Sequence, residues 1–311
     1  MSLLLEVFAV AASMLMGVSI GASTVSTAFG PVNGARSANV LRSALLAGLM
    51  AFLGALIQGG SVTETVSKGV VAGGLNPLQG GTVLFIAGVL VLVSVLKDYP
   101  MPTAFTVIGS VLGIGIGFGA EIEWAMVLRV VGYWLFIPLA SVIMGYLAAK
   151  VFRKYMDRED DERKIKWLLL ISGCYVSFSA GASAVGLAVG PLAGLGVKTV
   201  FLLILGGLAI LLGAWMYSPR IIRAVSFDYS NIGPRRSLAA LLTAGTLAQI
   251  GIFFGIPISF NEAIIASVIG SGLVEGKSNT DSKKIFRTVA AWVGAFFLAI
   301  LLAFAVGLPF R

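Results

Sequence analysis

Residues 21–31 read GASTVSTAFGP, and residues 181–191 read GASAVGLAVGP. The two stretches share the pattern G-A-S-x-V-x-x-A-x-G-P, and the second copy lies 160 residues after the first. A second matched pair lies downstream, where residues 100–115 align without gaps to residues 257–272 at a separation of 157. Two matched pairs at nearly equal separations indicate an internal duplication, which decides how the fold is organised.

The chain that carries these repeats is too apolar for a protein surrounded by water. Of its 311 residues, 58% are hydrophobic and 12% are charged, whereas about 25% charged is usual in soluble domains. A helix needs about 20 apolar residues to cross the hydrocarbon core. Ten apolar segments are candidate spans, at residues 3–28, 38–59, 81–97, 103–119, 125–149, 167–190, 197–217, 237–254, 257–274 and 288–308. The sequence therefore predicts an all-α, polytopic membrane protein.

The most hydrophilic stretch, residues 150–166, divides the chain almost in the middle. We interpret it as a charged cytoplasmic linker between a first transmembrane repeat at 1–149 and a second at 167–311. Because each repeat holds five predicted spans, the second repeat enters the membrane from the opposite side. Such inverted-topology repeats are typical of secondary transporters, in which the substrate binds near the midplane where the repeats meet.

The net charge of +8 follows from this topology. If the N-terminus is outside, 18 of the 22 basic residues fall in inner connections, and Lys68, Arg129, Lys198 and Arg311 remain outside. Cytoplasmic connections carry an excess of Lys and Arg. We therefore expect a protein of the cytoplasmic membrane with both termini extracytoplasmic, and we expect no nucleic-acid partner.

Enzymatic chemistry has little support in the sequence. The chain has no histidine and one cysteine, Cys174, so it lacks the usual zinc ligand and the usual general base. It has no phosphate-binding P-loop motif. We therefore predict that the protein is not an enzyme and uses neither a cofactor nor a metal.

The repeated motifs form the candidate anion-binding site. Glycine and proline inside an apolar span are expected to break the helix there, and the resulting helix N-terminus carries partial positive charge at bilayer depth. Hydroxyl and amide groups nearby add neutral donors. A packing or backbone-capping role is the alternative for each hydroxyl. The candidate binding residues are Gly21, Ala22, Ser23, Thr24, Thr103, Gly181, Ala182, Ser183, Ser259, Phe260 and Asn261.

Glu262 is the candidate proton-coupling residue. It starts an otherwise apolar segment, and a carboxylate inside a membrane is costly enough to suggest a function. The alternative is a glutamate at the membrane interface that faces water. Glu64, near the outer end of the second predicted span, is interpreted as structural.

The combination of motifs resembles the inorganic phosphate transporter (PiT) family along nearly the whole chain. The duplicated family signature, G-A-N-D-V-A-N-A, has altered counterparts at residues 21–28 and 181–188. Residues 52–69 resemble the family's segment after the first signature. Residues 232–236 (IGPRR) resemble another characteristic segment of the family, and residues 257–259 resemble the start of its P-V-S-T-T-H motif. The resemblance implies transport of an inorganic oxyanion together with a proton or sodium ion, and a homodimer.

The departures from the family pattern favour sulfate. The Asn-Asp pair, implicated in the family in sodium and phosphate binding, is Ser23-Thr24 in the first half and Ser183-Ala184 in the second, and Glu262 replaces the histidine of the later motif. Phosphate near neutral pH keeps a proton that a carboxylate can accept, whereas sulfate has none and is repelled. The chain is in these respects similar to the CysP-type sulfate permeases of the family, so we predict sulfate import by proton symport. Phosphate transport coupled to sodium or protons, and a passive anion channel, are the alternatives.

Overall fold

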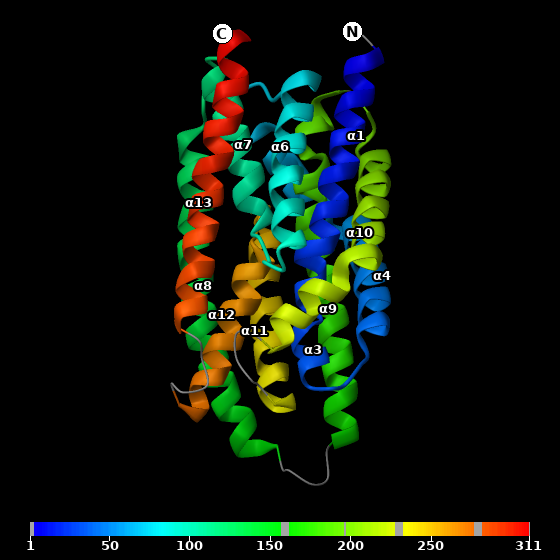
Figure 1. The fold of residues 1–311 in the computed structure, drawn as a ribbon, viewed down its shortest axis with the longest axis vertical. Coiled ribbons are helices and arrows are strands. Elements are labelled where there is room, and N and C mark those ends of the chain that lie inside the picture. Colours follow the sequence, from blue (N-terminus) through cyan, green and yellow to red (C-terminus); the bar gives the residue numbers. More distant parts are fainter. Residues whose placement is uncertain (1–2, 157–161, 196, 228–232, 277–281, 311) are drawn as a thin grey trace.

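The computed structural model describes residues 3–156, 162–195, 197–227, 233–276 and 282–310. Over these residues the chain is an elongated bundle of helices without a named β-strand (Figure 1). In this part of the chain, eight helices are long and apolar enough to cross a membrane. The predicted class, an all-α membrane protein with several spans, is confirmed.

The first half of the chain starts with the helix that carries the first motif. That helix is α1 (Leu3–Ile20), which continues through a π-helical turn (Gly21–Val25) into α2 (Ser26–Ala28). The elements that follow are α3 (Gly30–Gly34), α4 (Val40–Gln58), α5 (Gly60–Lys68), α6 (Pro77–Leu96), α7 (Thr103–Gly117) and α8 (Trp124–Tyr155). The short helix α5 was not anticipated from the sequence.

The second half has the corresponding order of long helices. The second motif lies in α9 (Glu162–Val189), which is followed by a 3₁₀ turn (Gly190–Leu195) and α10 (Thr199–Phe227). The remaining elements are α11 (Pro234–Phe253), α12 (Phe260–Gly272), a 3₁₀ turn (Leu273–Glu275), α13 (Ser282–Gly307) and a last 3₁₀ turn (Leu308–Phe310). The ends of α8 and α9 occupy most of the predicted linker at 150–166, of which residues 157–161 lie outside the described residues.

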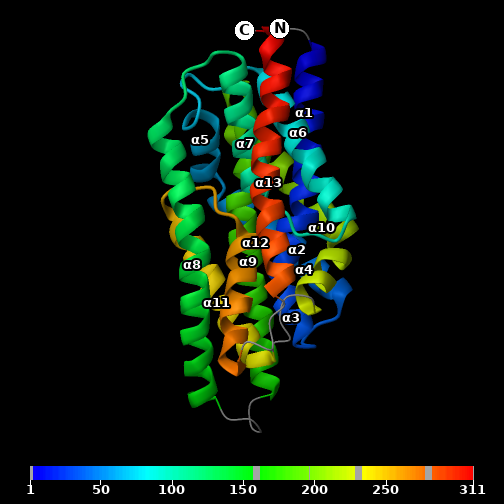
Figure 2. The same ribbon diagram turned by 60° about the vertical axis from the view of Figure 1, so that its left-hand side comes forward.

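Each predicted span corresponds to one helix, but two of these helices are too short to cross the membrane. α7 has 15 residues and α12 has 13, so at about 1.5 Å per residue they reach only ~20 Å of the ~30 Å hydrocarbon core. α6 and α7 form one helical hairpin, and α11 and α12 form another, with both tips near the middle of the bundle (Figures 1 and 2). The expectation of complete crossings at 103–119 and 257–274 is therefore wrong.

The two hairpin tips have the same backbone construction. The helix that enters each tip ends beside a residue with positive φ, Asp98 at 60° and Gly255 at 67°. The next helix starts after an extended residue, Pro102 with ψ 103° or Ser259 with ψ 98°. Proline in each tip lacks the N–H that a helix requires and disfavours helical geometry in the residue before it. The breaks in the fold therefore fall at these prolines.

The path of the chain agrees with an inverted repeat. The N-terminal and C-terminal ends lie at one end of the bundle, and the helix ends that flank the predicted linker lie at the opposite end (Figure 1). Each half thus makes an odd number of crossings. The orientation of this arrangement in the cell membrane stays a prediction.

Glycines let helices of opposite repeats approach each other closely. A Cβ added at Gly21 would overlap the carbonyl oxygen of Ile210 on α10, and one added at Gly181 would overlap that of Ala51 on α4. The two contacts are equivalent under the repeat, because α4 and α10 occupy corresponding places in the two halves. The motif glycines thus contribute to packing between the repeats.

Gly181→Ala is expected to destabilise the protein because the methyl group meets backbone rather than a movable side chain. Overpacking of this kind costs about 1–3 kcal/mol. The matched control is Gly294→Ala on α13, where an added Cβ has no neighbour within 4 Å and alanine favours a helix over glycine by about 1 kcal/mol. Thermal unfolding in detergent should show a lower midpoint for the first variant only, and equal midpoints would contradict the packing role.

Each hairpin tip is held by the last helix of the other repeat. The indole Nε1–H of Trp292 on α13 donates to the carbonyl of Pro100 at 3.0 Å, and that of Trp134 on α8 donates to the carbonyl of Pro257 at 3.3 Å. Both tryptophans are buried or nearly so. α7 likewise packs on α13 and α12 packs on α8. The two repeats therefore exchange their last helices rather than folding side by side.

Candidate functional site

The motif serines connect the long motif helices to the hairpin tips. The Ser23 hydroxyl accepts a hydrogen bond from the backbone N–H of Met101 at 3.2 Å, and the Ser183 hydroxyl accepts one from the N–H of Ile258 at 3.2 Å. Both serines are fully buried. Because the two pairs occupy equivalent positions in the repeats, the duplication predicted from the sequence extends to the hydrogen bonds of the site.

Asn261 joins the second hairpin to the first motif. Its amide Nδ2 donates to the Ser23 hydroxyl at 3.1 Å and to the Met101 carbonyl at 2.5 Å. Its Oδ1 accepts from the Thr27 hydroxyl at 2.7 Å. Thr27 was not among the residues selected from the sequence, although it lies within the first motif and one turn after Ser23.

A pair of threonines completes the contact between the first motif and the first hairpin. The hydroxyls of Thr24 and Thr103 share a hydrogen bond of 3.1 Å, and both residues are buried. Thr103 is the first residue of α7. The equivalent positions in the second half are Ala184 and Phe260, also buried, so the site is polar mainly on the side of the first motif.

Glu262 lies in the first turn of α12, next to Asn261, and is 4% exposed. It is buried, in contrast to the water-facing alternative considered for it. The hydroxyl of Ser259, three residues earlier, is buried without a hydrogen-bond partner. No other acidic side chain is buried among those whose exposure the structure describes. The equivalent position in the first half is Phe105, whose ring stacks on Trp134 with centroids 4.1 Å apart.

Gly21 and Gly181 do not break the helices, although the Gly-Pro end of each motif does. The first motif starts in a π-helical turn and crosses the junction at Phe29 between α2 and α3, whereas the second lies in α9 and ends in the 3₁₀ turn that starts at Gly190. The helix N-termini at the hairpin tips are those of α7 and α12. Proline breaks these helices, whereas Gly21 and Gly181 serve close packing. Any contact of Gly21 or Gly181 with a ligand would therefore involve the backbone.

The remaining candidates lie close to this cluster. Ala22, Ala182 and Phe260 are fully buried and bring no polar side chain to the site. Within the described residues, no three acidic or cysteine side chains gather where they would hold a metal ion. The polar groups that come together are thus hydroxyls, one amide and one carboxyl group, which suit an anion and a proton.

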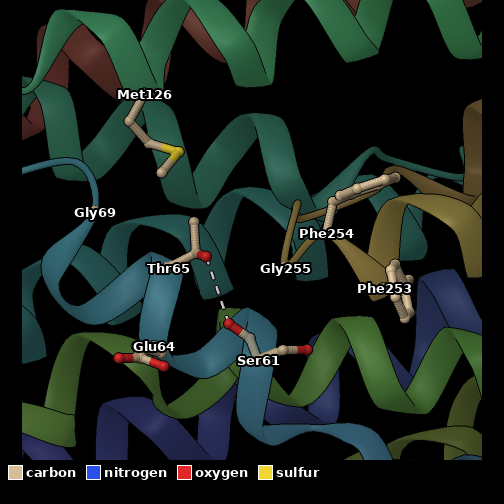
Figure 3. A pocket seen from close by; sticks show the side chains of 8 residues that line it. All are labelled: Ser61, Glu64, Thr65, Gly69, Met126, Phe253, Phe254 and Gly255. Atoms are coloured by element: carbon tan, nitrogen blue, oxygen red, sulfur yellow. Dashed lines mark hydrogen bonds between the residues drawn. The ribbon is translucent and has the colours of Figure 1, made fainter.

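A separate pocket of about 440 Å³ lies between α5, the start of α8 and the second hairpin tip (Figure 3). Glu64 and Thr65 line it, and the Ser61 hydroxyl donates to the Ile252 carbonyl at 3.2 Å. Gly255 of the tip also borders this pocket. Glu64 is exposed here, on a helix that the sequence had not separated from the second span.

Comparison with known proteins agrees with this architecture. The profile described as the phosphate transporter family matches residues 20–303. The chain belongs to the phosphate transporter family. The family is one of transporters rather than enzymes, and the chain is accordingly an anion transporter with several membrane-spanning helices.

Individual relatives in this family differ in their named substrates. The chain is 27% identical over 307 residues to the sulfate permease CysP of Bacillus subtilis, covering 96% of this chain and 86% of that protein. It is 21% identical over 397 residues to the chloroplastic inorganic phosphate transporter 2-1 of Arabidopsis thaliana, covering 89% and 67%. A solved structure titled the sodium-dependent phosphate transporter matches with a TM-score of 0.86, 20% identity and 98% coverage of both chains, so the two share the fold.

Proposed function

We propose that this protein imports sulfate across the cytoplasmic membrane by proton symport, with access alternating between the two sides of the membrane. The observation that carries the proposal is the buried cluster of neutral donors at the hairpin tips, in which a hydroxyl group occupies the place of the signature carboxylate. The sulfate permease named among the relatives supports the same substrate.

The donor set suits a fully deprotonated oxyanion. Hydroxyl and amide groups donate hydrogen bonds without adding negative charge, and the N-termini of α7 and α12 favour an anion beside them. Thr24 stands where the family signature has an aspartate. Without that carboxylate, the site has lost the acceptor for a phosphate proton and also the charge that repels sulfate. The binding residues proposed are those of the motifs and tips, with Ser23, Thr24 and Asn261 at the centre.

Glu262 is proposed as the proton carrier. It follows Asn261 directly in the chain and is buried in the first turn of α12, so protonation would remove a negative charge from the hairpin tip proposed to bind the anion. A protonated carboxyl group would therefore accompany bound sulfate, and release of the proton would favour release of the anion. This arrangement couples the two species by electrostatics alone.

The hydrogen bonds across the repeats suggest how access alternates. Asn261 of the second hairpin is bonded to Ser23 and Met101 of the first repeat, so the described site is closed by contacts between repeats. An anion has to replace these contacts when it enters. Relative motion of the two repeats would then open the site first to one side and then to the other.

Phosphate is the alternative substrate, with sodium or protons as the coupling ion. The phosphate transporters among the relatives support it. A passive anion channel with the same donors is the other alternative. The proposal further includes extracytoplasmic termini, which the distribution of basic residues supports, and a homodimer, which only the family resemblance supports.

The proposal is tested by uptake of labelled sulfate and labelled phosphate into proteoliposomes. Imposed inward proton and sodium gradients are compared at a clamped membrane voltage. Saturable sulfate accumulation that requires the proton gradient is the expected result. Sodium-driven phosphate accumulation would overturn the substrate and the coupling ion, and uptake that never exceeds equilibrium would indicate a channel.

A further inference from the structure

A basic pocket lies at the end of the bundle opposite the two termini. It has a volume of about 690 Å³ and is bordered by the end of α8, the start of α9, the start of α11 and the 3₁₀ turn after α12. Its lining includes four basic residues and one acidic residue, namely Arg153, Lys166, Arg235, Arg236 and Glu275. It is distinct from the buried cluster at the hairpin tips.

The charges of this pocket come from four separate elements. Arg236 Nη2 forms an ion pair of 3.0 Å with Glu275 Oε2, which joins the start of α11 to the end of the second hairpin. Arg153, Lys166 and Arg235 add three positive charges around the same space. An excess of basic residues on the cytoplasmic side accounts for their presence at this end. It does not account for their convergence on one cavity.

The position of the pocket relates it to the central site. Ala35, just after the short helix α3 that begins within the first motif, borders the pocket, as does Val274, which follows α12. The pocket therefore adjoins the far ends of both segments that carry Ser23 and Asn261. A cavity of this volume holds far more than a four-oxygen anion, so the anion would stay partly hydrated there.

We propose that this basic pocket is a vestibule that binds the transported inorganic dianion at the linker end of the protein. This inference rests on the proposed function. Positive charge around a concave opening raises the local concentration of an anion by about tenfold or more. Sulfate leaving the central site is held there by Arg153 and Arg235 before it enters the surrounding solution.

Cysteine labelling tests the vestibule without requiring transport. Cys174 is the only cysteine of the chain, so Cys174→Ala gives a background in which Val274→Cys, or separately Met156→Cys, places one thiol in the pocket lining. The rates of modification by an anionic and a neutral methanethiosulfonate reagent are compared in phosphatidylcholine nanodiscs. Each rate is divided by the rate of the same reagent with a free thiol. After this correction, we expect the anionic reagent to react about tenfold faster than the neutral one.

The variants then assign this effect to the pocket. Combined Arg153→Gln and Arg235→Gln should bring the ratio of the two rates close to that of a free thiol. Arg287→Gln, an exposed arginine near the start of α13 that does not line the pocket, should leave the ratio unchanged. An equal fall in both variants would overturn the proposal, because it would show a general surface potential.

Added sulfate identifies the ligand. Sodium sulfate should slow the anionic reagent several-fold more than sodium gluconate of equal ionic strength, and this difference should vanish in the double variant. If phosphatidylglycerol in the nanodiscs slows the anionic reagent but sodium sulfate does not, a lipid headgroup rather than a free dianion occupies the pocket, and the proposal is overturned. If sulfate protects the thiol but proteoliposomes take up no sulfate, the proposed function fails and the site stands. If proteoliposomes take up sulfate but sulfate does not protect the thiol, the vestibule proposal is wrong and the proposed function is unaffected.

Discussion

Glu262→Gln is expected to abolish proton-driven accumulation of sulfate. Glutamine keeps the shape of the side chain and cannot release a proton, so the imposed gradient no longer drives the anion. One pH unit sustains at most about tenfold accumulation for each coupled proton, because 1.4 kcal/mol corresponds to a factor of ten. The accumulation ratio should fall to about one, measured as labelled sulfate inside proteoliposomes at clamped voltage.

Two further measurements separate coupling from folding. Glu262→Gln should still exchange internal for external sulfate, since the neutral donors of Ser23 and Asn261 are unchanged. Glu64→Gln removes an exposed carboxylate from the pocket at α5 and should accumulate sulfate as the unaltered protein does. Undiminished accumulation by Glu262→Gln would exclude this residue as the proton carrier.

Thr24→Asp is expected to exchange sulfate selectivity for phosphate selectivity. The substitution restores the signature acid at a buried position 3.1 Å from the Thr103 hydroxyl. Two unit charges about 4 Å apart repel each other by about 4 kcal/mol at an effective dielectric constant of ~20. Even half of this value lowers sulfate uptake by more than about tenfold. Phosphate uptake falls less, because the P–OH group of phosphate can donate a hydrogen bond to the new carboxylate.

The neutral variant Thr24→Asn is the matched control. Asparagine has the size of aspartate without its charge, so sulfate uptake should fall much less than in Thr24→Asp. The measured quantity is the ratio of sulfate to phosphate uptake at equal concentrations. If both variants change this ratio equally, size rather than charge determines the selectivity of the site.

The positions of the helices were largely predictable from the sequence, because long apolar segments have few alternatives in a bilayer. The residues at which the helices begin and end were less predictable. α8 continues to Tyr155 and α9 begins at Glu162, beyond the apolar segments that predicted them. Charged residues at a helix end can extend into water while the backbone hydrogen bonds continue, and apolar length does not record this extension.

The sequence selected residues that meet at the hairpin tips, but it did not predict how the structure joins them. The matched motifs identified Ser23, Ser183 and Asn261, whose hydrogen bonds now connect the motif helices and the hairpin tips. Helix breaks were predicted where glycine and proline interrupt an apolar segment. They lie at the Gly-Pro end of each motif and at the tip prolines, whereas Gly21 and Gly181 lie inside helical turns. Glycine permits both a break and close packing, and only the neighbouring helix, distant in sequence, decides between them.

The exchange of last helices also constrains biogenesis. The tip carbonyl of Pro100 receives its hydrogen bond from Trp292, which the ribosome makes 192 residues later. The first hairpin therefore enters the membrane well before its partner α13 exists, and its buried surface faces lipid or the insertion machinery in the meantime. Neither repeat is therefore a complete folding unit, because the first hairpin reaches its final contacts only after α13 is inserted.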